Sequence, residues 1–149
     1  MVYYFAYGSN MRAERMKKRG LNFKSSVHGV LNGYSLKFNK IASDFSNEGY
    51  ANIVLDKKGV VEGILYEVTE NDLNKLDIPE GVSTGHYYRK EVDVQLDSGE
   101  KVKAIAYVAQ QNKIKEGLKP SKDYLNHLLE GKKFLSKEYF KKLSETETL

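Results

Sequence analysis

Apolar residues between positions 2 and 109 come in short runs bounded by Gly, Asn, Asp, Ser and Lys. Such runs are typical of β-strands joined by turns. In one of them Val92, Val94 and Leu96 alternate with polar residues, as expected for a strand with one buried face. The predicted strands lie at 2–7, 26–31, 34–40, 50–55, 60–68, 87–96 and 101–109.

Three tight turns are predicted between these strands. Asn32-Gly33 has the sequence of a two-residue hairpin turn. Residues 56–59 (Asp-Lys-Lys-Gly) and 97–100 (Asp-Ser-Gly-Glu) are turn sequences between two further pairs of strands, and 42–49 is a polar loop. We therefore expect three consecutive hairpins.

Two short helices interrupt the predicted strands. Residues 11–19 have helical character, with Asn10 as the expected N-cap and Gly20 as the stop. Thr69 is expected to begin the second helix, because Asp72 stands in the capping-box position three residues later.

After Pro120-Ser121 the apolar spacing becomes helical until Gly131, and Ser136 is placed to cap a last helix. The apolar positions of these two helices are Tyr124, Leu125, Leu128 and Leu129, then Tyr139, Phe140 and Leu143. Residues 144–149 are expected to form a frayed tail. Residues 1–149 are expected to form one α+β domain, a small antiparallel sheet curled toward a barrel and packed by short helices.

Composition narrows the class of protein. The chain has 149 residues, 40% of them hydrophobic, which suffices for one core. No apolar run is long enough to predict a membrane span, and no secretory signal is visible. The chain has no cysteine, which excludes disulfides, thiol nucleophiles and thiolate metal sites and suits a cytoplasmic location.

The formal charge of +4 raises the question of nucleic acid. A nucleic-acid-binding protein concentrates its positive charge on one surface. Here Lys and Arg gather in small groups at 17–19, 132–133 and 141–142, each on or beside a predicted helix. That distribution is typical of solvated helix faces, so no nucleic-acid partner is predicted.

Several kinds of catalytic site are not indicated. His28, His86 and His127 are far apart in the sequence and lack metal-ligand spacing, so no metal site is predicted. The chain contains neither a G-x-S-x-G nucleophile motif nor a Walker-type phosphate loop. Ser9 is a poor candidate nucleophile, because no neighbouring histidine is evident to activate it.

Two short stretches carry candidate chemistry. Tyr7-Gly8-Ser9-Asn10 stands where a strand gives way to a helix, and such a junction offers unpaired N–H groups to an anion. The same four residues are also typical of a plain helix start. Asp77-Ile78-Pro79-Glu80-Gly81 is predicted to be a turn that holds Glu80 in a loop, where it is either a functional carboxylate or a surface residue.

Together these stretches resemble the γ-glutamylcyclotransferase-like family. The resemblance rests on "YGSN", "GYANIV", "VEGILYEV", "LDIPEGV…GHYYRKEVDV", "KPSKDYLNHLLEG" and "SKEYFKKL", in this order. It covers about residues 2–143. Residues 41–50 match least, and this loop is a candidate for shaping substrate preference.

The resemblance implies a small mixed, mostly antiparallel β-barrel with flanking short helices and a cavity at one end. It implies an enzyme that needs no cofactor: the α-amine of a γ-glutamyl amide attacks its own γ-carbonyl, giving 5-oxoproline and a free amino acid or amine. Glu80 matches the family's acid–base position. The substrate-binding positions are Tyr7, Gly8, Ser9, Asn10, Tyr124 and Tyr139. The pKa of Glu80 would have to rise above about 4.3 for this role.

Two other functions remain open at this point. One is a non-catalytic module that binds a small metabolite, and the other is a basic nucleic-acid-binding domain. Glu80 argues against the first, because a carboxylate does not help to bind an anion. The sequence does not identify the leaving amine, and a homodimer is implied only by the resemblance.

Overall fold

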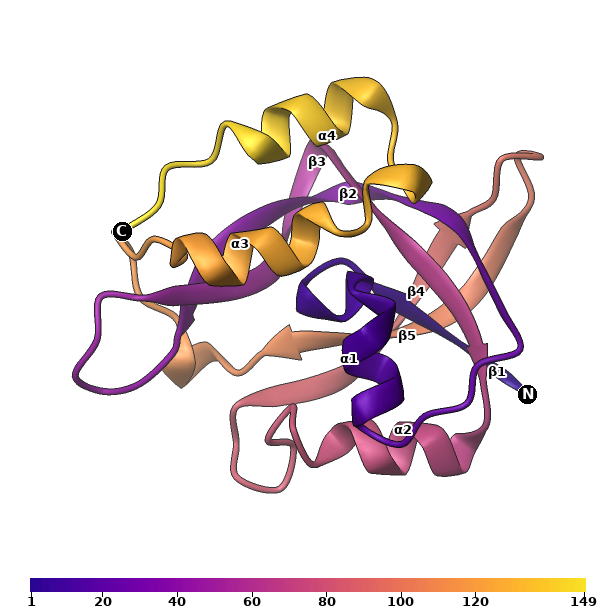
Figure 1. Ribbon diagram of the computed structural model, residues 1–149, viewed down its shortest axis with the longest axis horizontal. Coiled ribbons are helices and arrows are strands. Elements are labelled where there is room, and N and C mark those ends of the chain that lie inside the picture. The colour runs from indigo at the N-terminus through magenta and orange to yellow at the C-terminus, as the bar shows by residue number, and fades with distance from the viewer.

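The computed structural model describes all residues, 1–149, and shows a closed β-barrel with short helices around it (Figure 1). The strands are β1 (Val2–Ala6), β2 (Ser25–Ile41), β3 (Gly49–Val68), β4 (Tyr87–Gln95) and β5 (Lys101–Ala109), in the spatial order β1-β3-β2-β4-β5. The ladders are antiparallel except where β1 meets β5 in parallel, at Tyr4 and Ile105. The expected small mixed barrel is therefore confirmed.

Strands β2 and β3 correct the sequence prediction. Asn32-Gly33 and residues 56–59 do not reverse the chain; each lies inside one long strand, and only the hairpin turn at 97–100 is confirmed. The turn between β2 and β3 is the polar loop that follows Ile41. The first two predicted hairpins are thus wrong, and one long hairpin replaces them.

The two false turns face each other across the ladder. Asn32 pairs with Val60 and Tyr34 pairs with Leu55, so Gly33 alone stands opposite residues 56–59. Gly33 has a φ of +86°, a left-handed conformation that suits glycine. A bulge bends the strand that carries it and increases the local twist, which long strands need in order to close a barrel.

The helices fit the capping prediction with one exception. In α2 (Glu70–Asp77) the predicted Thr69–Asp72 capping box is formed, and Ser136 caps α4 (Lys137–Ser144) as predicted. Ser121, for which no cap was predicted, caps α3 (Lys122–Leu129). The first helix, α1 (Ala13–Lys18), is shorter than predicted.

Asn10 was expected to cap α1, but it does not. It lies in a 3₁₀ turn, η1 (Ser9–Met11), and Arg12 precedes the helix without a side-chain cap. Two further short turns are η2 (Gln111–Lys113) and η3 (Lys132–Phe134). The side chain of Asn10 is thereby free for contacts elsewhere.

One apolar core fills the barrel and holds the helices against it. Its fully buried side chains include Phe5, Leu65 and Val94 from the strands, Met16 from α1, and Leu73, Leu76 and Leu128 from α2 and α3. Figure 1 shows α3 and α4 together over one side of the barrel, α2 at the opposite side, and α1 between them. None of the helices has the length and apolar character needed to cross a membrane.

A polar contact fixes the start of α4 on the barrel. Glu62 of β3 accepts hydrogen bonds from the backbone N–H of Ser136 at 2.8 Å and from its hydroxyl at 2.6 Å. His28 of β2 lies between Glu62, at 2.9 Å, and Asp97, at 2.6 Å. Burial by itself lowers the pKa of His28, but the hydrogen bonds to the two carboxylates outweigh it, and the net pKa is raised.

We expect this contact to make the stability of the protein depend on pH. Since the folded pKa of His28 lies above its unfolded value of about 6.5, its contribution is complete below that pH and is lost as the pH rises through the folded pKa. His28→Gln should lower the free energy of unfolding by about 2 kcal/mol at pH 6, the size of a charged hydrogen bond.

Denaturant unfolding of both proteins at pH 6 to 9 would test this expectation. The difference between wild type and variant should shrink as the pH rises. A difference that stays constant across this range would contradict it.

Candidate active site

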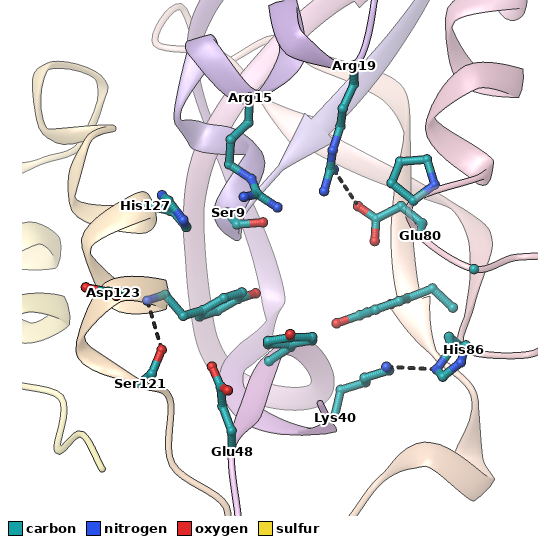
Figure 2. Close-up of a pocket in the computed structure, with 15 residues that line it drawn as sticks. Ser9, Arg15, Arg19, Lys40, Glu48, Glu80, His86, Ser121, Asp123 and His127 are labelled. Atoms are coloured by element: carbon teal, nitrogen blue, oxygen red, sulfur yellow. Dashed lines mark hydrogen bonds and ion pairs between the residues drawn. The ribbon is translucent and has the colours of Figure 1, made fainter. Parts of the chain in front are cut away.

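A cavity of about 450 Å³ opens at one end of the barrel, where α1, α3 and the loop after α2 meet (Figure 2). Its lining is mostly polar. It comprises Ser9, Arg15, Arg19, Lys40, Glu48, Tyr50, Pro79, Glu80, Gly81, His86, Tyr87, Ser121, Asp123, Tyr124 and His127. A smaller adjoining space reaches toward the core and is lined by Tyr4, Tyr7, Gly8, Asn10 and Tyr107 as well. Glu80 borders both spaces.

The turn after α2 places Glu80 in the cavity. The N–H of Glu80 donates to the carbonyl of Leu76 at 3.1 Å, which continues the last turn of the helix. Gly81 then takes a φ of +66°, and a Cβ built there would lie only 2.9 Å from the ring of His86. The turn therefore needs glycine at this position, both for its conformation and for its close packing.

A second set of contacts fixes the helix end just before the turn. Asp77 accepts two hydrogen bonds from Arg89, at 2.9 and 2.8 Å, and one from the Tyr107 hydroxyl at 2.7 Å. The two-point pairing of a guanidinium with a carboxylate has a defined geometry. These strand residues thus hold the end of α2 and, through it, the position of Glu80.

Glu80 lies in surroundings that favour its neutral form. Its side chain is 17% exposed, and burial raises its pKa. The charges of Arg19, Arg15 and Lys40 and a 3.3 Å hydrogen bond from Asn10 oppose this rise without cancelling it. A carboxyl group with a raised pKa exchanges a proton more readily near neutral pH, which suits an acid–base catalyst.

The loop from Tyr7 to Asn10 lies beside Glu80. The backbone N–H groups of Met11 and Arg12 donate hydrogen bonds to the carbonyl groups of Gly8 and Ser9. The N–H groups of Ser9 and Asn10 are the first of a helical turn and have no partner within it. This is the arrangement expected of an anion-binding loop.

Side chains on both sides fix the position of this loop. The Asn10 amide group donates to the Tyr4 hydroxyl at 2.8 Å and accepts from Arg19 at 2.8 Å. A Cβ at Gly8 would lie 3.2 Å from the Ala51 side chain and 3.6 Å from the Tyr124 hydroxyl. The absence of a side chain at Gly8 therefore keeps the loop close to both.

The tyrosine hydroxyls have different partners. Tyr7 is buried and donates to the carbonyl of Tyr107, so its hydroxyl is already used. The Tyr124 hydroxyl accepts from the backbone N–H of Ala51 at 3.0 Å, which leaves its own proton for another acceptor. The ring of Tyr124 stacks on Tyr50, with 4.7 Å between centroids.

Arg15 and Lys40 are cations of the cavity without an ion pair. Figure 2 shows Arg15 directed from α1 toward Ser9, and Lys40 on another side of the cavity beside His86. The Nε atom of Arg15 is buried and has no hydrogen-bond partner. Burial lowers the pKa of both side chains, as expected where a cation lacks a counter-ion.

Comparison with known proteins gives consistent results. The model of the AIG2-like family matches residues 60–143. A Bos taurus gamma-glutamylcyclotransferase is 31% identical and its Homo sapiens counterpart 30%, each over 97% of this chain and 78% of its own length. A solved structure named gamma-glutamyl cyclotransferase has a TM-score of 0.86 and 29% identity, covering 99% of this chain and 89% of that one.

The chain belongs to the AIG2-like family. Membership confirms the resemblance found in the sequence. It also agrees with the closed mixed barrel, since the solved structure covers nearly the whole of this AIG2-like chain. No group of three or more His, Cys, Asp or Glu side chains is placed to hold a metal ion.

The structure brings most of the predicted site residues of this AIG2-like chain together. Glu80, Tyr124 and the four residues of the loop border the cavity and its inner extension. Tyr139 does not join them. It lies on α4 and lines a separate groove, beside Glu62 and Ser136.

Tyr139→Phe should therefore leave catalysis unchanged. The Tyr139 hydroxyl is buried without a hydrogen-bond partner, so its removal should leave the free energy of unfolding within about 1 kcal/mol of wild type. Initial rates over a range of substrate concentrations, with melting curves, would check this. A kcat/KM that falls tenfold in the folded variant would show that Tyr139 contributes to the active site.

The cations of the cavity were not predicted from the sequence. Arg15 and Arg19 are one helical turn apart, so their spacing on α1 could have placed both on the face beside the loop. Lys40 gave no comparable indication, because a lysine at the end of a predicted strand is ordinarily exposed. Its burial depends on loops that are distant in the sequence.

Proposed function

We propose that this protein is a γ-glutamylcyclotransferase, which converts a γ-glutamyl amide to 5-oxoproline and a free amino acid or amine. One observation carries the proposal. Glu80, with a raised pKa, lies beside a loop with free N–H donors and an unpaired arginine, in a cavity of about 450 Å³. The named relatives support the same reaction.

The α-carboxylate of the substrate would bind at the loop. The N–H groups of Ser9 and Asn10 supply hydrogen bonds, and Arg15 supplies the opposite charge. The Tyr124 hydroxyl, next to Gly8, has a proton to donate to the same substrate. The α-amine is thereby directed toward Glu80.

Glu80 would act first as a base. It takes a proton from the α-ammonium group, and the free amine attacks the γ-carbonyl carbon to form the new C–N bond of a five-membered ring. Holding the amine and carbonyl of one molecule in contact removes much of the entropic barrier. The ring nitrogen keeps its second surplus proton until Glu80 has passed on the first.

Glu80 would act next as an acid. The proton that it holds passes to the nitrogen of the leaving amine, and the old C–N bond breaks. Glu80, ionised again, then takes the second proton from the ring nitrogen and gives it to the released amine. The two protons lost by the ring nitrogen equal the two gained by the leaving amine, which departs as an ammonium ion. No other reactant is consumed, and Glu80 returns to its starting state.

A panel of γ-glutamyl dipeptides and γ-glutamylamines, assayed for 5-oxoproline, tests the proposal. Release of 5-oxoproline together with equimolar amine is the expected result. Binding of these compounds without any cyclisation would favour the alternative function, a module that senses a small metabolite.

The proposed function also includes the partners and the location of the protein. It includes a small-molecule substrate, no nucleic-acid or membrane partner, and a cytoplasmic location for a chain that has no cysteine. A homodimer remains a prediction from the family resemblance, and sedimentation velocity would test it.

A further inference from the structure

His127 lies on α3 and lines the cavity of the candidate active site, where the proposed reaction gives it no task. Helix α3 packs against the turn η1, which carries Ser9 and Asn10. Figure 2 shows the His127 ring directed from α3 toward the side of the cavity where Ser9 and Arg15 lie. The imidazole is therefore a neighbour of the place where the α-carboxylate would bind.

A hydrogen bond fixes which ring nitrogen of His127 carries the proton. Nη1 of Arg12 lies 3.2 Å from Nδ1 of His127, and a guanidinium group can donate a hydrogen bond but not accept one. Nδ1 must therefore accept, which places the proton of the neutral ring on Nε2. This is the one hydrogen bond of the His127 side chain, so the Nε2–H group is left for a ligand in the cavity.

The surroundings of His127 keep its ring neutral in the free protein. Burial and the charges of Arg15 and Arg12 lower its pKa, and the opposite effects of Asp123 and Glu130 do not cancel this. A neutral imidazole with its proton on Nε2 donates a hydrogen bond through that atom. It therefore suits the binding of an acceptor and not the removal of a proton from the substrate.

The α-carboxylate has room for one more donor. The two oxygens of a carboxylate offer about four lone-pair sites. In the proposed reaction the N–H groups of Ser9 and Asn10 and the guanidinium group of Arg15 take one site each, which leaves one. Since these donors belong to η1 and α1, a donor from α3 approaches the carboxylate from another element.

We propose that His127 is an additional substrate-binding residue, whose Nε2–H group donates a hydrogen bond to the α-carboxylate. This inference rests on the proposed function and deepens it, because it adds a neutral donor from α3 to the site. The competing role is purely structural: His127 would then serve only to join α3 to Arg12.

Two amide variants separate the binding role from the structural one. In His127→Asn the amide oxygen can replace Nδ1 as the acceptor for Arg12, but no donor stands in the place of Nε2. In His127→Gln the longer side chain brings an amide N–H group to that place. His127→Asn should raise KM for γ-glutamylalanine about tenfold, as expected for a lost hydrogen bond to a charged group, and change kcat less than about twofold. His127→Gln should recover part of the affinity, and Asn126→Ala, at an exposed position of the same helix, should keep all of it.

Two ligands that do not react identify the group that His127 binds. 5-Oxoproline carries the carboxylate, and 2-pyrrolidone is the same ring without it. Nitrogen NMR of the labelled wild type should find the His127 proton on Nε2, in signals that are absent from His127→Gln. The Nε2 signal should move when 5-oxoproline is added but not when 2-pyrrolidone is added. His127→Asn should weaken the binding of 5-oxoproline about tenfold.

These measurements keep the two proposals distinguishable. If 5-oxoproline binding depends on His127 but no γ-glutamyl compound is cyclised, the cyclotransferase proposal fails and the role of His127 stands. If His127→Asn cyclises γ-glutamylalanine with the wild-type KM, the role of His127 fails and the cyclotransferase proposal stands. A His127 proton found on Nδ1, an equal loss in the Asn and Gln variants, or 5-oxoproline that binds the wild type no better than 2-pyrrolidone would also overturn the role of His127.

Discussion

Glu80→Gln should lower kcat by about 10²- to 10⁴-fold, the usual contribution of a positioned acid–base group. Glutamine keeps the shape of the side chain and can still meet Asn10 and Arg19, but it cannot take a proton from the substrate amine at neutral pH. Substrate affinity should change little, because the loop and Arg15 still hold the α-carboxylate. Glu80→Asp should also be impaired, since the shorter side chain withdraws the carboxylate from the amine.

The pH dependence of kcat/KM gives a second measurement on the same variants. If Glu80 is the base, kcat/KM of the wild type should fall as the pH is lowered through the pKa of Glu80, which burial places above its usual value. Glu80→Gln should lack this acidic limb. Melting curves of the variants serve as the control for folding.

A Glu80→Gln variant that turns over γ-glutamyl substrates near the wild-type rate would show that Glu80 is a structural turn residue. That outcome would leave the fold and the family unaffected. It would require another base among the residues that line the cavity, such as His127.

Arg15→Met should raise KM by about 10- to 100-fold with a smaller effect on kcat. Removing a hydrogen bond to a charged group costs about 1.5–3 kcal/mol, which corresponds to this change in affinity. Methionine keeps the apolar stem and removes the guanidinium group, whose Nε is buried without a partner in the free protein. Folding should therefore be maintained or slightly improved.

Steady-state rates on γ-glutamylalanine, with Lys17→Met on the same helix as the matched control, would measure the effect of Arg15. Lys17 is exposed and does not line the cavity. An unchanged KM in Arg15→Met would show that the α-carboxylate binds elsewhere and that Arg15 does not contact the substrate.

The false turns at Asn32-Gly33 and 56–59 show the limit of local sequence patterns. The chemistry of a turn is present, since the backbone N–H of Lys58 donates to the side chain of Asp56 at 3.1 Å. Nevertheless the chain continues in the same ladder, because β2 and β3 pair on both sides of the bulge. Whether a turn sequence reverses a chain or bends it depends on the strands that pair around it.

Asn10 shows the same limit at the site. Its position before a helix made it an expected N-cap, yet its side chain links Tyr4, Arg19 and Glu80. Those partners come from a strand, a helix and a turn up to 70 residues away. A helix-capping rule considers only the next three residues, so it cannot foresee such competition.

The sequence by itself determined the features that depend on a few neighbouring residues. The caps at Thr69 and Ser136, the turn at 97–100 and the turn that presents Glu80 all follow from contacts within about four positions. The tertiary structure decided how these pieces meet. Closing the barrel put Lys40 against His86 and Arg15 beside the loop, and it turned Tyr124 toward the cavity and Tyr139 away from it. The physical reason is that a residue's burial and partners are set by packing between distant segments, which no local pattern records.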